Sequence, residues 1–193
     1  MDIILASKSP RRHELLTMLG YEFTVRVSNA PEPPPLPGLS PPENLRIITA
    51  AKGEATARDN PVCAVIAADT VVVLDGVYYG KPESGADAAR MLKTLAGQTH
   101  EVFTGVALYN VKSGFSQHEC VCTPVTFREL SEREILDYIK TGEPMDKAGA
   151  YGIQGFGEAL IERVDGDFYN VMGLPVGALR SMLFNLQCYL RSK

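Results

Sequence analysis

A strand and a helix are encoded within residues 3–20, IILASKSPRRHELLTMLG. The leading apolar residues predict a short buried strand, and Ser9 and Pro10 then suit the N-cap and the first helical position. Arg11 and Arg12 therefore fall in the first turn, where the helix dipole is already positive and backbone N–H groups lack a helical partner. Two cations at that end predict a bound anion, and a phosphate chain fits this requirement.

The composition restricts the class of protein. The chain has 193 residues, of which 45% are hydrophobic, and this suits one globular domain over residues 1–193 with two lobes. The formal net charge of −4 disfavours a general nucleic-acid binder. A small anionic ligand therefore suits the arginine pair better than a nucleic-acid polymer does.

The sequence also predicts a cytoplasmic protein without a membrane partner. Asp2 stands where a signal peptide would carry a basic residue, and no apolar stretch is long enough to span a bilayer. The cysteines have neither a zinc spacing nor a CxxC pair, which favours half-buried, reduced thiols. They are Cys63, Cys120, Cys122 and Cys188.

Strand and helix patterns alternate along the rest of the chain, and frequent hairpins indicate a mixed sheet. The proline-rich residues 30–42 predict an exposed loop or lid, because proline lacks a backbone donor. Asp-Gly at 75–76 predicts a hairpin turn, and residues 159–164 and 168–172 are expected to form a second hairpin. The other expected strands cover 22–28, 62–74, 77–79, 100–109 and 115–128, and the other expected helices cover 40–58, 84–96, 131–141 and the residues after 175.

Asp69 is the second candidate for chemistry, because it lies in the middle of an apolar strand. A carboxylate there needs a partner, and it can serve as a metal ligand, as a general base for water, or as an acceptor of structural hydrogen bonds. Lys52 lies beside the apolar stripe of its helix, where its ammonium either extends to solvent or meets an anion. Lys81 follows the first hairpin in a loop, where a lone lysine is usually solvated.

Residues 146–155, DKAGAYGIQG, form a glycine-rich segment. Its small residues leave room either for a ligand against the backbone or for close packing alone. Asp146 and Lys147 add opposite charges, and the amide of Gln154 can read a base edge. No Walker loop and no GxSxG elbow is present, so cations and carboxylates remain, which suits metal-assisted hydrolysis of a phosphoanhydride.

These segments together resemble the Maf family of nucleoside triphosphate pyrophosphatases. The resemblance implies the α/β fold shared with the inosine triphosphate pyrophosphatases, a mixed twisted sheet with flanking helices and two lobes around a cleft. It implies hydrolysis of a nucleoside triphosphate to its monophosphate and pyrophosphate, and the form of residues 146–155 is similar to the subfamily that prefers dTTP and UTP. The matching segments, in family order, are 7–12, 68–71, 80–82, 146–155 and 173–175.

The resemblance also implies roles for individual residues. Asp69 corresponds to the proton acceptor, and Arg11, Thr70 and Gln154 correspond to positions that determine substrate specificity. The remaining polar cleft positions are the phosphate-binding Ser7, Arg12, Lys52 and Lys81, together with Asp146 and Lys147.

The resemblance further implies a divalent cation, Mg²⁺ or Mn²⁺, held by Asp69 together with Glu32, the acidic residue that lies in the proline run near the second strand. Whether Asp69 acts as base or as metal ligand stays open, since a carboxylate bound tightly to metal is a poorer base. An alternative function is a nucleotide-binding regulator of cell division with little turnover, which the resemblance also allows. Relatives suggest a homodimer.

Overall fold

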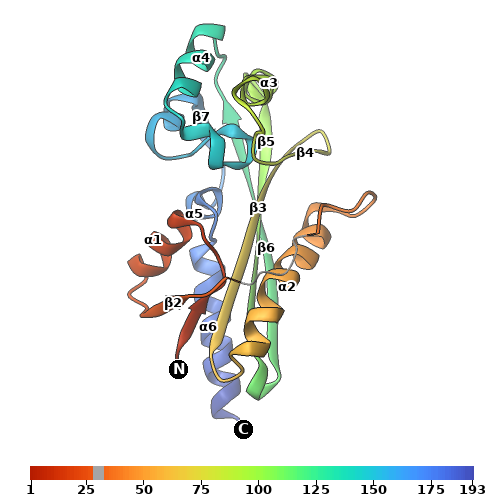
Figure 1. The fold of residues 1–193 in the computed structure, drawn as a ribbon, viewed down its shortest axis with the longest axis vertical. Coiled ribbons are helices and arrows are strands. Elements are labelled where there is room, and N and C mark those ends of the chain that lie inside the picture. Colours follow the sequence, from red (N-terminus) through yellow and green to blue (C-terminus); the bar gives the residue numbers. More distant parts are fainter. Residues whose placement is uncertain (28–32) are drawn as a thin grey trace. The chain divides into compact units, whose positions relative to one another are not determined.

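The computed structural model of the chain describes residues 1–27 and 33–193. Its sheet has seven strands in the order β2-β1-β3-β5-β6-β7, with β4 paired to β3 (Figure 1). β1 runs parallel to β2 and β3, whereas β3–β4 and β6–β7 are antiparallel, so the expected mixed sheet is confirmed. The strands are β1 (Ile3–Leu5), β2 (Phe23–Val25), β3 (Ala64–Leu74), β4 (Val77–Tyr79), β5 (Thr99–Asn110), β6 (Phe115–Phe127) and β7 (Ile161–Val164).

The chain divides into two compact units. Unit 1 comprises residues 1–69, 104–121 and 173–193, and unit 2 comprises residues 70–103 and 122–172. Within the described parts of the chain, no helix combines the length and apolar character needed to cross a membrane. The α-helices are α1 (Pro10–Met18), α2 (Pro41–Asp59), α3 (Gly85–Leu95), α4 (Glu132–Lys140), α5 (Phe168–Met172) and α6 (Val176–Arg191).

Unit 1 begins with the predicted strand and helix. The Ser9 side chain caps α1 by accepting from the backbone N–H of Arg12, and Pro10 occupies the first turn. α2 opens with a capping box, in which the backbone N–H of Ser40 donates to Glu43 over 2.8 Å. Both helix starts are therefore confirmed, and both are set by local hydrogen bonds.

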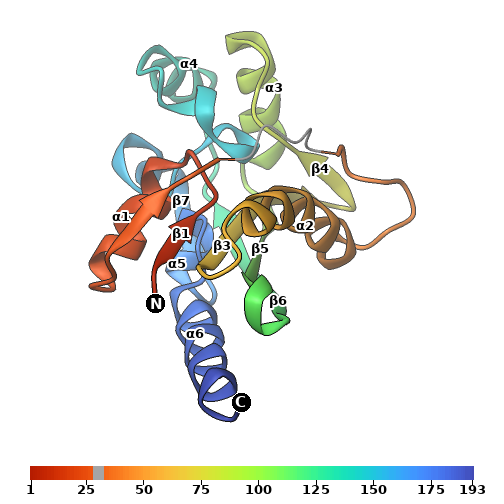
Figure 2. The same cartoon turned by 60° about the horizontal axis from the view of Figure 1, so that its bottom comes forward.

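In unit 1, α2 lies beside β3 and β5 (Figure 2), and two glycines allow the helix to approach the sheet closely. A Cβ added to Gly53 of α2 would lie 2.6 Å from the Tyr109 ring and 3.0 Å from Cβ of Ala67. A Cβ added to Gly105 of β5 would lie 2.8 Å from Cβ of Leu45. Contacts below 3.0 Å are not tolerated, so glycine at these two places sets the separation of helix and sheet.

Unit 2 has its own apolar core, which includes Leu92 of α3, Phe127 of β6, Ile135 of α4 and Tyr151. Three short 3₁₀ turns, η2 (Glu143–Asp146), η3 (Ala148–Ala150) and η4 (Gly155–Leu160), carry the glycine-rich segment past this core. The predicted Asp-Gly turn is confirmed, since Asp75 and Gly76 both have positive φ, 51° and 77°.

The second predicted hairpin is wrong. Residues 161–164 form β7 against β6, but residues 168–172 form the short helix α5. The cause is Asp167, whose carboxylate accepts from the backbone N–H groups of Tyr169 and Asn170 over 2.9 and 3.2 Å. An aspartate that satisfies these donors starts a helix rather than a strand. The second strand is also shorter than the expected 22–28, and residues 28–32, which include the start of the proline-rich loop, lie outside the described residues.

Candidate active site

The arginine pair of α1 divides into one buried and one half-buried side chain. Arg12 is only 9% exposed. Its Nε donates to the carbonyl oxygen of Gly173 over 2.7 Å, and its terminal nitrogen donates to Oγ of Ser7 over 3.1 Å. Arg12 therefore links the segments at residues 7–12 and 173–175, which lie far apart in sequence. Arg11 stays half-buried at the same helix end.

Lys52 of α2 and Asp69 of β3 form an ion pair within unit 1. Nζ of Lys52 lies 2.6 Å from Oδ1 of Asp69, and the two side chains are 15% and 22% exposed. The alternation of side chains in β3 explains this pairing. Asp69 lies on the same face of the strand as Ala67, and Ala67 packs near Gly53 of α2, the helix that carries Lys52. The sequence allowed the Lys52 ammonium either to extend to solvent or to meet an anion, and the structure supports the anion. The pair holds a carboxylate in a fixed place within an apolar strand.

The described residues offer a limited donor set for a metal ion. In residues 1–27 and 33–193, no three His, Cys, Asp or Glu side chains are grouped as a metal site. Glu32, the second expected ligand, lies outside the described residues. One carboxylate does fit Mg²⁺ or Mn²⁺ that takes its other ligands from substrate phosphates and water, but it does not fit an all-protein cage.

Thr70 follows Asp69 in β3 and therefore points to the opposite face of the strand. That face also carries Val72, whose side chain lies where a Cβ on Gly149 would meet it at 3.0 Å. The backbone N–H of Gly149 donates to the carbonyl oxygen of Gly80 over 3.0 Å. In unit 2, β3 and the loop before Lys81 thus both contact the glycine-rich segment. Lys81 itself is exposed.

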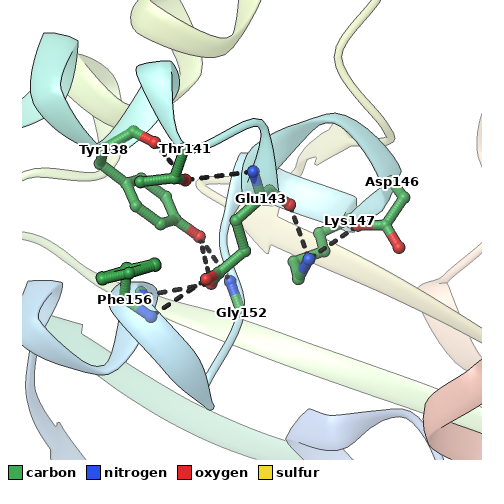
Figure 3. A network of polar contacts seen from close by, with 8 residues as sticks. Tyr138, Thr141, Glu143, Asp146, Lys147, Gly152 and Phe156 are labelled. Carbon is green, nitrogen blue, oxygen red and sulfur yellow. Dashed lines mark hydrogen bonds and ion pairs between the residues drawn. The ribbon is translucent and has the colours of Figure 1, made fainter.

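The charges of the glycine-rich segment pair with each other (Figure 3). Nζ of Lys147 donates to Oδ1 of Asp146 over 2.7 Å and to the carbonyl oxygen of Glu143 over 2.6 Å. The Lys147 side chain is largely buried, while that of Asp146 is mostly exposed. Lys147 therefore fastens the turn that contains it, and Gln154 lies exposed further along the segment.

Tyr151 anchors the same segment in the core of unit 2. Its hydroxyl lies 2.7 Å from Nε2 of His100, and both rings meet Phe127 edge to face. Nδ1 of His100 is buried with no hydrogen-bond partner among the described residues. This burial lowers the pKa of His100 to about 4 and raises the pKa of Tyr151 far above its usual value.

The predicted site residues thus fall into local groups. Unit 1 brings Ser7 together with Arg12, and Lys52 together with Asp69. Unit 2 brings Asp146 together with Lys147. Sequence reasoning missed Glu143, Tyr138 and His100, which support the glycine-rich segment and become recognisable only once that segment folds against them. The arrangement in unit 1 combines a buried cation at a helix N-terminus with a fixed carboxylate, as phosphate binding and activation of water require.

A family model and several curated relatives match this chain over nearly its whole length. A family model described as Maf-like protein matches residues 2–186. The chain is 45% identical over 186 residues to a dTTP/UTP pyrophosphatase of Aquifex aeolicus (strain VF5), with 96% of each chain covered. It is 46% identical over 189 residues to a dTTP/UTP pyrophosphatase of Bacillus velezensis (strain DSM 23117 / BGSC 10A6 / LMG 26770 / FZB42), covering 96% of this chain and 97% of that relative.

A solved structure agrees on the fold. A HAM1 protein from Coxiella burnetii aligns with a TM-score of 0.55 at 16% identity, covering 96% of this chain and 99% of the other. At this identity the likeness concerns the fold alone, and it agrees with the mixed α/β sheet and flanking helices described above. Together with the family model and the relatives that match over nearly their whole length, these findings show that the chain belongs to the Maf family.

Proposed function

We propose that this chain hydrolyses dTTP and UTP, including modified forms of these nucleotides, to the monophosphate and pyrophosphate. The names of relatives at about 45% identity support the reaction. The observation that carries it is the 2.6 Å pair between Lys52 and Asp69 in the centre of β3. A carboxylate paired with a lysine, in a chain that also buries an arginine at a helix N-terminus, suits attack of water on a phosphate chain.

In the proposed mechanism the cations bind the triphosphate. Arg12 already donates to Ser7, so the two residues hold a fixed donor geometry at the N-terminus of α1. Lys52 and Lys81 provide further positive charge for the phosphate oxygens. Asp69 accepts a proton from the water that attacks the α-phosphorus, and the leaving group is pyrophosphate.

A divalent cation is part of this proposal. Asp69, with Glu32, would hold Mg²⁺ or Mn²⁺, and the ion would polarise the phosphoryl oxygens. Asp69 accepts from Lys52 through Oδ1, and no hydrogen bond to Oδ2 is present among the described residues. The other carboxylate oxygen of Asp69 therefore remains available to a metal ion. The choice between the base and the ligand role is a matter for experiment.

The test is product analysis of the purified chain with UTP or dTTP and Mg²⁺ or Mn²⁺. The proposal requires UMP or dTMP plus pyrophosphate, and in H₂¹⁸O the label must enter the monophosphate. UDP with orthophosphate would show cleavage at the γ-phosphate and would refute it. Binding without turnover would favour the nucleotide-binding regulator. Asp69→Asn should lower kcat by about 10²-fold or more, because it removes the carboxylate charge needed in either role.

We also propose the domain organisation, the compartment and the class of ligand of this protein. The two units act as one Maf-like domain over residues 1–193. The protein belongs in the cytoplasm, and this is supported by cysteines that form no disulfide among the described residues, two of them half-buried and two exposed, as a reducing compartment allows. The net charge of −4 supports a small nucleotide, rather than a nucleic-acid polymer, as its ligand.

A further inference from the structure

We propose that Glu143, together with Tyr138, positions the loop of residues 152–157 so that Gln154 can select the base of the substrate. Neither Glu143 nor Tyr138 was singled out by the sequence patterns above. The inference rests on the proposed function for the identity of the substrate. It rests on the geometry of unit 2 for the way in which the loop is held.

The carboxylate of Glu143 collects three donors (Figure 3). Its Oε1 accepts from the hydroxyl of Tyr138 over 2.9 Å and from the backbone N–H of Gly157 over 3.1 Å. Its Oε2 accepts from the backbone N–H of Phe156 over 3.0 Å. Hydrogen bonds to an ionised acceptor are stronger than neutral ones, so this carboxylate is the main polar attachment of the loop.

Tyr138 extends the attachment to the other side of Gln154. Its hydroxyl donates to Glu143 and accepts from the backbone N–H of Gly152 over 3.1 Å. Gly152 lies two residues before Gln154, whereas Phe156 lies two residues after it. The loop is thus held on both sides of Gln154 by one tyrosine and one glutamate.

Glycines allow the carboxylate to come this close. A Cβ on Gly155 would lie 2.7 Å from Oε2 of Glu143, and φ at Gly155 is +75°. A Cβ on Gly157 would lie 2.2 Å from the carbonyl oxygen of Gly152 and 2.7 Å from the Tyr138 hydroxyl. Of the two interpretations of the glycine-rich segment, close packing therefore applies at Gly155, and the same close packing extends to Gly157 just beyond the segment. Their packing partner is the Glu143–Tyr138 pair.

Gln154 depends on this support because its own side chain is exposed. No hydrogen bond of that side chain to the described residues is present, so the backbone on either side determines where its amide is presented. Glu143 is also fastened from behind, since its carbonyl oxygen accepts from Nζ of Lys147 over 2.6 Å. A change at Glu143 therefore alters the position of Gln154 without touching Asp69 or Lys52.

The experiment compares Glu143→Gln with Glu158→Gln, a matched change at an exposed carboxylate of the same loop region. UTP and CTP are the substrate pair, because they differ at the base edge that an amide can distinguish. The expected result for Glu143→Gln is a loss of about tenfold in the ratio of kcat/KM for UTP to that for CTP, mostly through KM for UTP. Glu158→Gln should leave the ratio unchanged, and Tyr138→Phe should lower it in the same direction.

A double variant tests whether Glu143 acts through Gln154. Gln154→Ala alone should lower the UTP-to-CTP ratio, and adding Glu143→Gln should lower it no further, because both changes remove the same interaction. An unchanged ratio in Glu143→Gln overturns the proposal. So does a full additive loss in the double variant, which would indicate a structural role for Glu143 separate from Gln154.

Hydrogen exchange separates failure of this proposal from failure of the proposed function. Without nucleotide, the backbone amides of Gly152, Phe156 and Gly157 should exchange at least tenfold faster in Glu143→Gln than in the wild type or Glu158→Gln. If the wild type cleaves neither UTP nor dTTP, the proposed function fails, and base selection by this loop fails with it. Unchanged exchange of these amides overturns the positioning role whatever the activity.

Discussion

Acid should destabilise this protein through His100, a residue outside the proposed chemistry. The ring is about 1% exposed, and its Nδ1 has no hydrogen-bond partner among the described residues. Burial lowers the pKa of His100 in the folded state from 6.5 to about 4. At pH 7 the residue is neutral in the folded state and mostly neutral in the unfolded state, so it contributes little pH dependence there.

The direction and size of this pH effect follow from the thermodynamic linkage between proton binding and folding. As the pH falls below 6.5, the unfolded chain binds a proton at His100 before the folded chain does, so the free energy of unfolding decreases. The decrease continues until about pH 4, where the folded state also takes up the proton, and it amounts to roughly 3 kcal/mol at 1.36 kcal/mol per pKa unit. That is a large share of the stability of a typical domain.

The assay is urea unfolding at pH 7 and pH 4.5 of the wild type, His100→Gln and the exposed control His13→Gln. Glutamine at position 100 does not titrate and can still hydrogen-bond Tyr151. The wild type and His13→Gln should lose about 2–3 kcal/mol more than His100→Gln between the two pH values. Equal losses in all three proteins would refute the assignment of the pH dependence to His100.

Other predictions concern unit 1. Gly53→Ala should lower the free energy of unfolding by about 1–3 kcal/mol and lower kcat, because the new methyl group pushes α2, and Lys52 with it, from the sheet. Gly177→Ala is the control in calorimetry and turnover assays: it meets no atom within 4 Å and should be neutral or slightly stabilising, so equal losses in both would contradict the close-approach argument. Arg12→Ala should lower kcat/KM for every nucleotide and also lower the melting temperature, because Arg12 holds Ser7 and Gly173, whereas Arg11→Ala should change the ranking of UTP, dTTP and CTP. Equal losses across all substrates for both variants would contradict that division of roles.

The sequence predicted those parts of the fold that depend on neighbours in the chain. Ser9 and Ser40 start helices through bonds to residues three positions later, and the turn at Asp75 needs only its own backbone preference. The wrong strand at residues 168–172 is also a local matter. The apolar pattern of these residues fits either a strand or a short helix, and the hydrogen bonds of Asp167 favour the helix.

The supporting residues of the site could not be predicted in this way. Lys52 and Asp69 are 17 positions apart, so the sequence could name both but could not pair them. Glu143 bonds to backbone N–H groups 13 and 14 residues later, and every residue carries such a group, so no residue type signals the contact. His100 looked like one of several alternating positions of a strand, and its pairing with Tyr151 depends on the packing of unit 2.

The adjacency of Asp69 and Thr70 in β3 limits how related chains can differ in length. One residue inserted or lost between Ala64 and Asp69 would turn both side chains to the opposite faces of the strand, and would remove the carboxylate from Lys52. A change of two residues would restore the faces but displace both groups by about 7 Å along the strand. Length variation among functional relatives is therefore expected in the loops, while the spacing from the start of β3 to Asp69 stays constant.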